Sequence, residues 1–414
     1  MSGRSMERDE GTHAARPSLA DRVVRSIMLG AAHRIRVGQL TVILPDGSRE
    51  VVGTPGGPAA EIHIHDEAAI RRMLLGGETG AGEAYMDGLW SSPDLTGLLR
   101  LAARNRAALA LTAGWWRLPL QVPRIVAHRA RRNTIGQASR NIRRHYDLGN
   151  DFYRLFLDET MTYSSAVFES PDESLADAQR AKYRAIAERA GLRPGMRVLE
   201  IGSGWGGFAI HAASEIGCDV TSITISPAQQ ELANERIAAA GLADRARVEL
   251  RDYRRIDGTY DAIVSIEMLE AVGHDYFATF FEACDRALVP GGRIGLQTIT
   301  FPDVDYDAQR RSANWIQTYI FPGGLLPSLT VIERATAGTG LLIGGVRDIA
   351  SSYARTLAAW RSAFHARLDE VRALGFDERF IRMWDYYLSL SEAGFATGIT
   401  QVQQISLEKR RGLG

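Results

Sequence analysis

Two residue types are nearly missing from this 414-residue chain: cysteine and lysine occur only twice each. Cys218 and Cys284 stand apart, without the spacing of a metal or redox motif, so the sequence excludes a disulfide scaffold and fits a reducing cytoplasm. No apolar run approaches the roughly 20 residues that a membrane-spanning helix needs. The charged N-terminus lacks the apolar stretch of a secretory signal.

Acidic residues are missing from one long segment. Between Asp94 and Asp147 there is no Asp or Glu, whereas eleven arginines alternate with Trp115, Trp116 and aliphatic residues. This mixture is typical of contact with an anionic membrane surface, where each basic residue contributes about 1 kcal/mol. A solvated linker in an arginine-rich chain is the alternative. Nucleic-acid binding is not expected, because no recognition motif accompanies the charge.

The order of elements predicts two domains. We expect a disordered tail over 1–17, a small α+β accessory domain for lipid docking over 18–112, a basic linker over 113–140 and a catalytic domain over 141–414. In the small domain, helical spacing covers 19–32, 67–75 and 95–111, and strand-like alternation covers 34–44, 50–52 and 60–65.

The larger domain has the alternation of an α/β protein. Apolar strands are predicted at 197–201, 219–224, 247–250, 260–266 and 293–299, with helices at 207–216, 227–240 and 276–288. Strand and helix in turn at this spacing indicate a doubly wound, Rossmann-like parallel sheet with helices on both faces.

A glycine-rich loop follows the first of these strands, in the segment VLEIGSGWGG at 198–207. Gly202, Gly204 and Gly207 have the spacing of a nucleotide-binding turn, which dinucleotide folds share. A dinucleotide site also needs an acid at the end of the second strand, and that strand ends in ITIS without one. Glu200, before the first glycine, suits the amino group of a methionine, and Asp252, after the third strand, suits an adenine amino group. These residues favour S-adenosylmethionine (SAM).

Longer motifs carry a more specific resemblance. The segment HYDLGNDFYRLFLDETMTYSSAVF at 145–168 is similar to the entrance segment of the cyclopropane-fatty-acyl-phospholipid synthase family, which includes the mycolic-acid cyclopropane synthases. The resemblance continues through VTSITISPAQQ, IVSIEMLEAVGHDYF, TYIFPGGLLPS and FIRMWDYYLSLSEAGF, and GAGEAYMDGLW resembles the accessory domain. It covers nearly the whole chain.

The resemblance implies methyl transfer from SAM to a cis double bond of an unsaturated phospholipid acyl chain, which forms a cyclopropane. The alkene is a weak nucleophile, so a carbocation forms, and a base must remove a proton from the added methyl group. In the family that base is taken to be a bound bicarbonate, held by a cysteine backbone, a glutamate, a histidine and a tyrosine.

Carried over by motif, Glu270 matches the glutamate, Tyr353 the tyrosine, and Ile299 an isoleucine whose backbone contributes to the pocket. Two positions depart from the family: Ser165 replaces the usual cysteine, and Gln297 replaces a frequent histidine. An amide can still hydrogen-bond an oxyanion. Both departures leave open a methylene- or methyl-branched acyl chain as the alternative product.

For binding of the methyl donor SAM, the resemblance implies several residues in addition to Glu200 and Asp252. They are Tyr163, Ser164, Gly202, Gly204, Thr224, Gln229, Tyr253 and Ile266.

The expected partner is unsaturated phospholipid at the inner face of the membrane, which the cytoplasmic enzyme contacts peripherally, with a homodimer as the family-level expectation. No metal is expected, because His63 and His65 have no further ligand nearby in the sequence. A non-catalytic lipid-binding protein and a methyltransferase for a small soluble acceptor are the other hypotheses.

Overall fold

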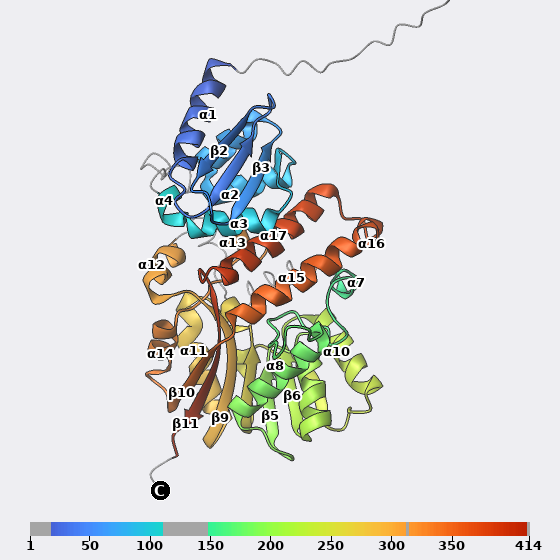
Figure 1. Cartoon of the computed structure of the whole chain (residues 1–414). Helices are drawn as coiled ribbons and strands as arrows, with labels where there is room; N and C mark the ends of the chain where they lie inside the picture. Colours follow the sequence, from blue (N-terminus) through green and yellow to red (C-terminus); the bar gives the residue numbers. More distant parts are fainter. Residues whose placement is uncertain (1–17, 111–147, 312–313, 412–414) are drawn as a thin grey trace, which may run out of the picture. The chain divides into compact units, whose positions relative to one another are not determined.

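The computed structural model describes residues 18–110, 148–311 and 314–411, and the chain divides into two compact units, 1–115 and 116–414 (Figure 1). The predicted tail at 1–17 and linker at 113–140 therefore lie outside the described residues. No helix in the described ranges is long and apolar enough to cross a membrane.

The first unit contains a four-stranded mixed sheet. Its strands β1 (Gln39–Ile43), β2 (Arg49–Gly53), β3 (Ala59–Ile64) and β4 (Trp90–Ser91) lie in the order β2-β1-β3-β4. Strands β1 and β3 are parallel, and the other neighbours are antiparallel. Four helices accompany the sheet: α1 (Leu19–Ala32), α2 (Glu67–Met86), α3 (Leu95–Arg104) and α4 (Arg106–Ala110).

Two helix predictions for this unit were wrong in extent. The helix predicted at 67–75 continues to Met86, with a kink at Gly77, where φ is 58°. The helix predicted at 95–111 is divided at Asn105, whose side chain accepts hydrogen bonds from the Arg36 and Val37 amides and donates to the Val37 carbonyl. That side chain ties α3 to a distant loop, an interaction that helical periodicity does not reveal.

The second unit is built on a seven-stranded sheet, and the doubly wound Rossmann-like prediction is confirmed (Figure 1). Strands β5 (Arg197–Ile201), β6 (Asp219–Thr224), β7 (Ala246–Leu250), β8 (Tyr260–Ile266) and β9 (Leu288–Thr300) are parallel. The order β7-β6-β5-β8-β9 reverses direction between β5 and β8. Ligands of such sheets bind at the carboxyl ends of the strands beside this reversal.

Two further strands at the other edge were not predicted. Strands β10 (Leu341–Asp348) and β11 (Gln401–Lys409) complete the order β9-β11-β10, and β11 is antiparallel to both neighbours. Strand β11 contains the buried polar residues Gln403 and Gln404, and β10 contains two consecutive glycines beside a register shift. Both features interrupt the apolar pattern that identifies a buried strand.

The helices cover two hydrophobic cores, one on each face of this sheet. Alternate residues of β5 divide between them: Val198 packs with α8 (Leu175–Ala190) and α9 (Gly207–His211), whereas Leu199 packs with α11 (Phe277–Ala287). The remaining helices are α7 (Asn150–Arg154), α10 (Pro227–Ala239), α12 (Asp303–Arg311), α13 (Trp315–Tyr319), α14 (Leu329–Thr336), α15 (Ala350–Ala366), α16 (Leu368–Ala373) and α17 (Glu378–Ala396).

Helices α15 and α17 run side by side (Figure 1). Trp360 on α15 and Trp384 on α17 form an aromatic cluster with Tyr153, Phe156 and Tyr163, with ring centroids 5.1–6.4 Å apart. This cluster anchors the segment that leads from Tyr163 to Ser165.

Gly207→Ala is expected to destabilise the second unit by about 1–3 kcal/mol, because overpacking forces neighbours to move. An added Cβ at Gly207 would lie 2.2 Å from the Tyr183 hydroxyl and 2.8 Å from the Thr160 carbonyl oxygen. Thermal unfolding measures the effect. The control is Gly338→Ala, where a Cβ meets nothing within 4 Å; equal melting temperatures for the two variants would contradict the prediction.

Candidate functional site

The glycine loop has the backbone that its sequence predicts. Gly202, Gly204 and Gly206 have φ values of 98°, 48° and 81°, a region that favours glycine. The amides of Gly202 and Ser203 both donate to the Ile223 carbonyl, which fixes the loop to the end of β6. An added Cβ at Gly202 would lie 3.0 Å from the Met268 side chain, whereas one at Gly204 would meet nothing within 4 Å. The loop therefore leaves room for a ligand to approach its backbone closely.

Glu200, at the end of β5, is buried and accepts a hydrogen bond of 2.5 Å from the Ser222 hydroxyl. Burial raises the pKa of this carboxyl to about 8, while Ser222 and the charge of Lys182 act in the opposite direction. A carboxyl in this position can hold an ammonium group of a ligand, as the sequence predicts for the methionine amino group.

Lys182 on α8 is a residue that the sequence analysis missed. Its side chain is fully buried, and Nζ donates a 2.8 Å hydrogen bond to the Ser164 hydroxyl. Burial lowers its pKa to about 8, whereas the charges of Glu267, Asp158 and Glu200 raise it. The only signal in the sequence was the rarity of lysine in this chain. The burial of Lys182, which lysine almost never shows without a partner, appears only in the structure.

The remaining residues predicted to bind SAM lie in the entrance segment, on α10, at the ends of β6 and β8, and after β7. The Tyr163 hydroxyl donates to that of Tyr387 at 2.8 Å, and the Thr224 hydroxyl donates to the Gln229 side chain at 2.9 Å. Ile266 ends β8, and the ring of Tyr253 packs 5.5 Å from that of Phe280.

Asp252 has a partner within the chain. Its two carboxylate oxygens accept from the backbone amide and the guanidinium of Arg254, and this pairing lowers the pKa of the Asp252 carboxyl against the effect of its burial. The adenine contact therefore stays a prediction that requires Asp252 to share its oxygens with Arg254.

The five predicted catalytic residues converge beside the ends of β8 and β9. Glu270 Oε1 accepts hydrogen bonds from the Ile299 amide and, at 2.9 Å, from the Thr298 hydroxyl. Its Oε2 is buried and has no hydrogen-bond partner in the described part of the chain. Burial, followed by the neighbouring charge of Glu267, raises the pKa of Glu270 to about 8. Roles in catalysis stay predictions.

A second carboxylate lies among them, and the sequence analysis missed it. Glu267 Oε1 accepts a 2.8 Å hydrogen bond from the Ser165 amide and a 2.9 Å bond from Gln297 Nε2. The Tyr353 hydroxyl interacts with the same carboxylate, and burial raises the pKa of both groups. The only signal in the sequence was a second glutamate three residues before Glu270.

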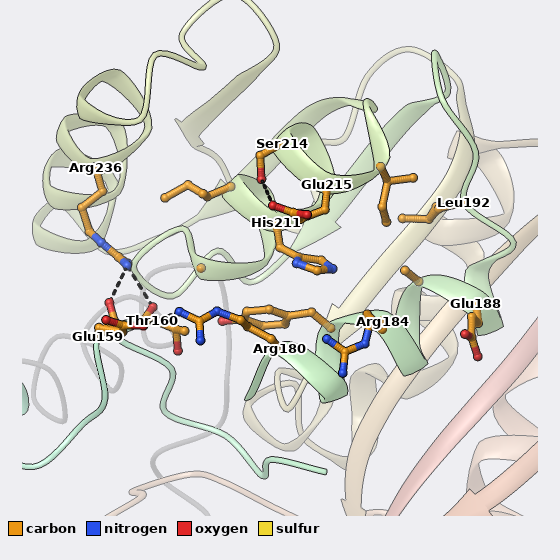
Figure 2. Close-up of a pocket in the computed structure, with 15 residues that line it drawn as sticks. Glu159, Thr160, Arg180, Arg184, Glu188, Leu192, His211, Ser214, Glu215 and Arg236 are labelled. Carbon is orange, nitrogen blue, oxygen red and sulfur yellow. Dashed lines mark hydrogen bonds and ion pairs between the residues drawn. The ribbon is translucent and has the colours of Figure 1, made fainter. Parts of the chain in front are cut away.

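A surface pocket of about 910 Å³ lies on another side of the glycine-loop helix. Figure 2 shows His211 on α9 and Arg184 on α8 extending toward one another across it, and Arg236 reaching the Glu159 and Thr160 carbonyls. Gly207 of the glycine motif lines this pocket, but none of the residues predicted for catalysis or SAM binding does. It is therefore distinct from the site described above.

The predicted histidine pair in the first unit has separate partners. His63 contacts Glu61, and His65 Nε2 lies 2.7 Å from the Ser91 hydroxyl. Within the described ranges, no group of three or more His, Cys, Asp or Glu side chains has the arrangement of a metal site.

Together, the strand order, the glycine loop and Glu200 define a SAM-dependent methyltransferase fold. Residues 133–405 match the model of the mycolic acid cyclopropane synthetase family. The chain belongs to this family, as its motifs predict, and is a SAM-dependent methyltransferase.

Three relatives illustrate the range of the family. The chain is 42% identical to tuberculostearic acid methyltransferase UfaA1 of Mycobacterium tuberculosis, over 95% of this chain and 92% of the relative. It is 34% identical to cyclopropane-fatty-acyl-phospholipid synthase of Escherichia coli, over 86% and 90%. A solved structure of mycolic acid cyclopropane synthase CmaA1 complexed with SAH and CTAB is 33% identical, with a TM-score of 0.61, over 66% of this chain and 98% of that one.

Proposed function

We propose that the protein transfers the methyl group of SAM to a cis double bond in an unsaturated phospholipid acyl chain. The observation that carries this proposal is that two groups of residues lie along one edge of the sheet. One is the glycine loop with Glu200, and the other is the Glu267–Glu270 cluster beside Ser165. Similarity to acyl-chain enzymes over most of the chain supports a lipid acceptor, as does the complex of a relative with CTAB, a lipid mimic.

Nine of the ten residues predicted to bind SAM have a specific role in this function, and Ile266 would line the pocket. Glu200 would hold the amino group of SAM, and Thr224, Gln229, Asp252 and Tyr253 lie at or after the ends of β6 and β7, where its nucleoside would lie. The backbone of Gly202 and Gly204 would pass close to the ligand, while Tyr163 and Ser164 would contact it from the entrance segment. SAM supplies the electrophilic methyl group.

For the product, we propose a methylene-branched acyl chain. The relative with the higher identity, over almost the whole chain, is a tuberculostearic acid methyltransferase, and the positions Ser165 and Gln297 depart from the cyclopropane synthase pattern. A saturated methyl branch would need a further two-electron reduction, which methyl transfer does not supply. A cyclopropane is the second candidate, supported by the Escherichia coli relative.

Proton NMR of the lipid product distinguishes these possibilities. Purified protein, SAM labelled in its methyl group and vesicles of a cis-unsaturated phospholipid are expected to give label in the acyl chain and signals of an exocyclic methylene. High-field cyclopropane protons would assign the second product instead. Absence of label from the lipid, or transfer to a small acceptor without vesicles, would contradict the proposed function.

We also propose that the enzyme is cytoplasmic and acts at the inner face of the membrane, docked through the small domain and the arginine-rich segment between Asp94 and Asp147. Most of that segment lies outside the described residues. Sedimentation with anionic vesicles, reduced at high salt, is the expected behaviour. A homodimer remains a proposal that light scattering tests.

A further inference from the structure

The residues expected to hold a bicarbonate do not fit that ion, because a side chain of the protein occupies their donors. The Ser165 amide and Gln297 Nε2 both donate to Glu267 Oε1, at 2.8 and 2.9 Å. A second hydrogen bond fixes the orientation of the Gln297 amide, since its Oε1 accepts a 3.0 Å bond from Gln404 Nε2. The amide group of Gln297 is therefore directed to donate toward the anion site.

The strained backbone of Glu267 points to a functional role for its carboxylate. Its φ of 49° makes it one of two non-glycine residues with positive φ in the described ranges. This left-handed conformation costs a residue with a Cβ about 1–2 kcal/mol, and such strain concentrates at functional sites. The Glu267 amide donates to the Gln297 carbonyl at 2.7 Å, so Gln297 on β9 holds both the backbone and the side chain of Glu267.

Three titratable groups face this carboxylate. Lys182 on α8 favours its ionised form, whereas Glu270 repels it and Tyr353 on α15 hydrogen-bonds to it. Burial outweighs the hydrogen bonds and raises the pKa of Glu267 above that of an exposed glutamate. A carboxylate whose pKa is raised toward neutral pH is a stronger base than an exposed carboxylate.

We propose that Glu267 is the base that removes the proton from the newly added methyl group, in the place of a bound bicarbonate. This inference rests on the proposed function. The alkene π electrons form the bond to the methyl carbon, the electrons of the S–C bond remain on sulfur, and the other alkene carbon becomes a cation.

For the methylene product, a hydride first moves from the methylated carbon to the neighbouring cation. The Glu267 carboxylate then takes a proton from the methyl group, and the electrons of that C–H bond form the exocyclic double bond. For a cyclopropane, the hydride does not move, and the same electrons close the ring. Atoms and charge balance in both cases without a further reactant.

The experiment measures label transfer from SAM to unsaturated phospholipid vesicles in bicarbonate-free buffer under argon, with and without added bicarbonate. The wild-type rate is expected to be the same in both buffers within about twofold. Glu267→Gln is expected to lose at least about 100-fold in turnover and to keep SAM binding and its melting temperature. Glu267→Gly, which suits the positive φ and frees both donors, is expected to regain activity with bicarbonate.

Two results would overturn the inference: a wild-type rate that requires bicarbonate, or a Glu267→Gln variant that keeps more than a tenth of wild-type turnover. The bicarbonate dependence of the wild type needs no variant, so the inference stays testable if a substitution fails to fold. Wild-type protein that transfers no label to any acyl chain would instead reject the proposed function, and the inference with it. Exposed Glu282→Gln is the matched control and is expected to behave as wild type.

Discussion

Glu270→Gln is expected to lower turnover about 100-fold while SAM binding remains within about twofold of the wild type. Glu267 and Glu270 are neighbouring buried carboxyls, and the charge of Glu267 helps raise the pKa of Glu270 to about 8. Two interacting carboxyls titrate together, and their apparent pKa values belong to the pair. An amide at position 270 removes the second titrating group.

One consequence reduces the rate in that variant. The proton that Glu267 accepts loses its neighbouring acceptor, because Glu270 Oε2 is the buried oxygen without a partner among the described residues. The Ile299 amide and Thr298 hydroxyl keep an acceptor in glutamine, so the local fold is preserved.

The measurement is single-turnover label transfer at saturating SAM, with calorimetry for donor binding. Exposed Glu282→Gln again serves as the control. Turnover within threefold of wild type would show that Glu270 acts only through neutral hydrogen bonds and would remove it from proton transfer.

The sequence predicted the parallel half of the large sheet well because each strand is buried on both faces. Residues 197–201, 219–224 and 260–266 match β5, β6 and β8, and their apolar runs end in turn residues. The antiparallel half was missed because β11 contains buried glutamines that hydrogen-bond inside the sheet, such as Gln404 with Gln297. Polar pairs of this kind depend on a partner more than 100 residues away.

The site was predicted as far as family motifs extend. They identified Glu270, Ser165, Gln297, Ile299 and Tyr353, which the fold brings together. They did not identify Glu267 or Lys182, because the importance of each follows from tertiary contacts. Glu267 directly follows the strand predicted at 260–266, and its role depends on a positive φ that composition does not encode. Lys182 occurs in a polar stretch of α8 that reads as solvent-exposed.

Lys182→Met is expected to shift the acid limb of the rate–pH profile to higher pH by about one unit, a differential interaction of about 1.4 kcal/mol. The positive charge of Lys182 lowers the pKa of Glu267 and of Glu200. Removing it raises both values, so a larger fraction of Glu267 is protonated at a given pH. A protonated base cannot accept the methyl proton, and the rate below the limb is therefore expected to fall about tenfold.

The direction of this effect separates a charge from a packing role. Methionine fills a similar volume but leaves the Ser164 hydroxyl without its 2.8 Å contact to Nζ, so turnover is measured at saturating SAM to remove changes in donor affinity. Recovery toward wild-type turnover at alkaline pH is expected, because Glu267 ionises there without help. Arg184→Met, an exposed cation two residues later on α8, is the control and is expected to leave the profile unchanged. A uniform loss at every pH would assign Lys182 to packing alone, whereas a displaced acid limb identifies it as the cation that keeps the base ionised.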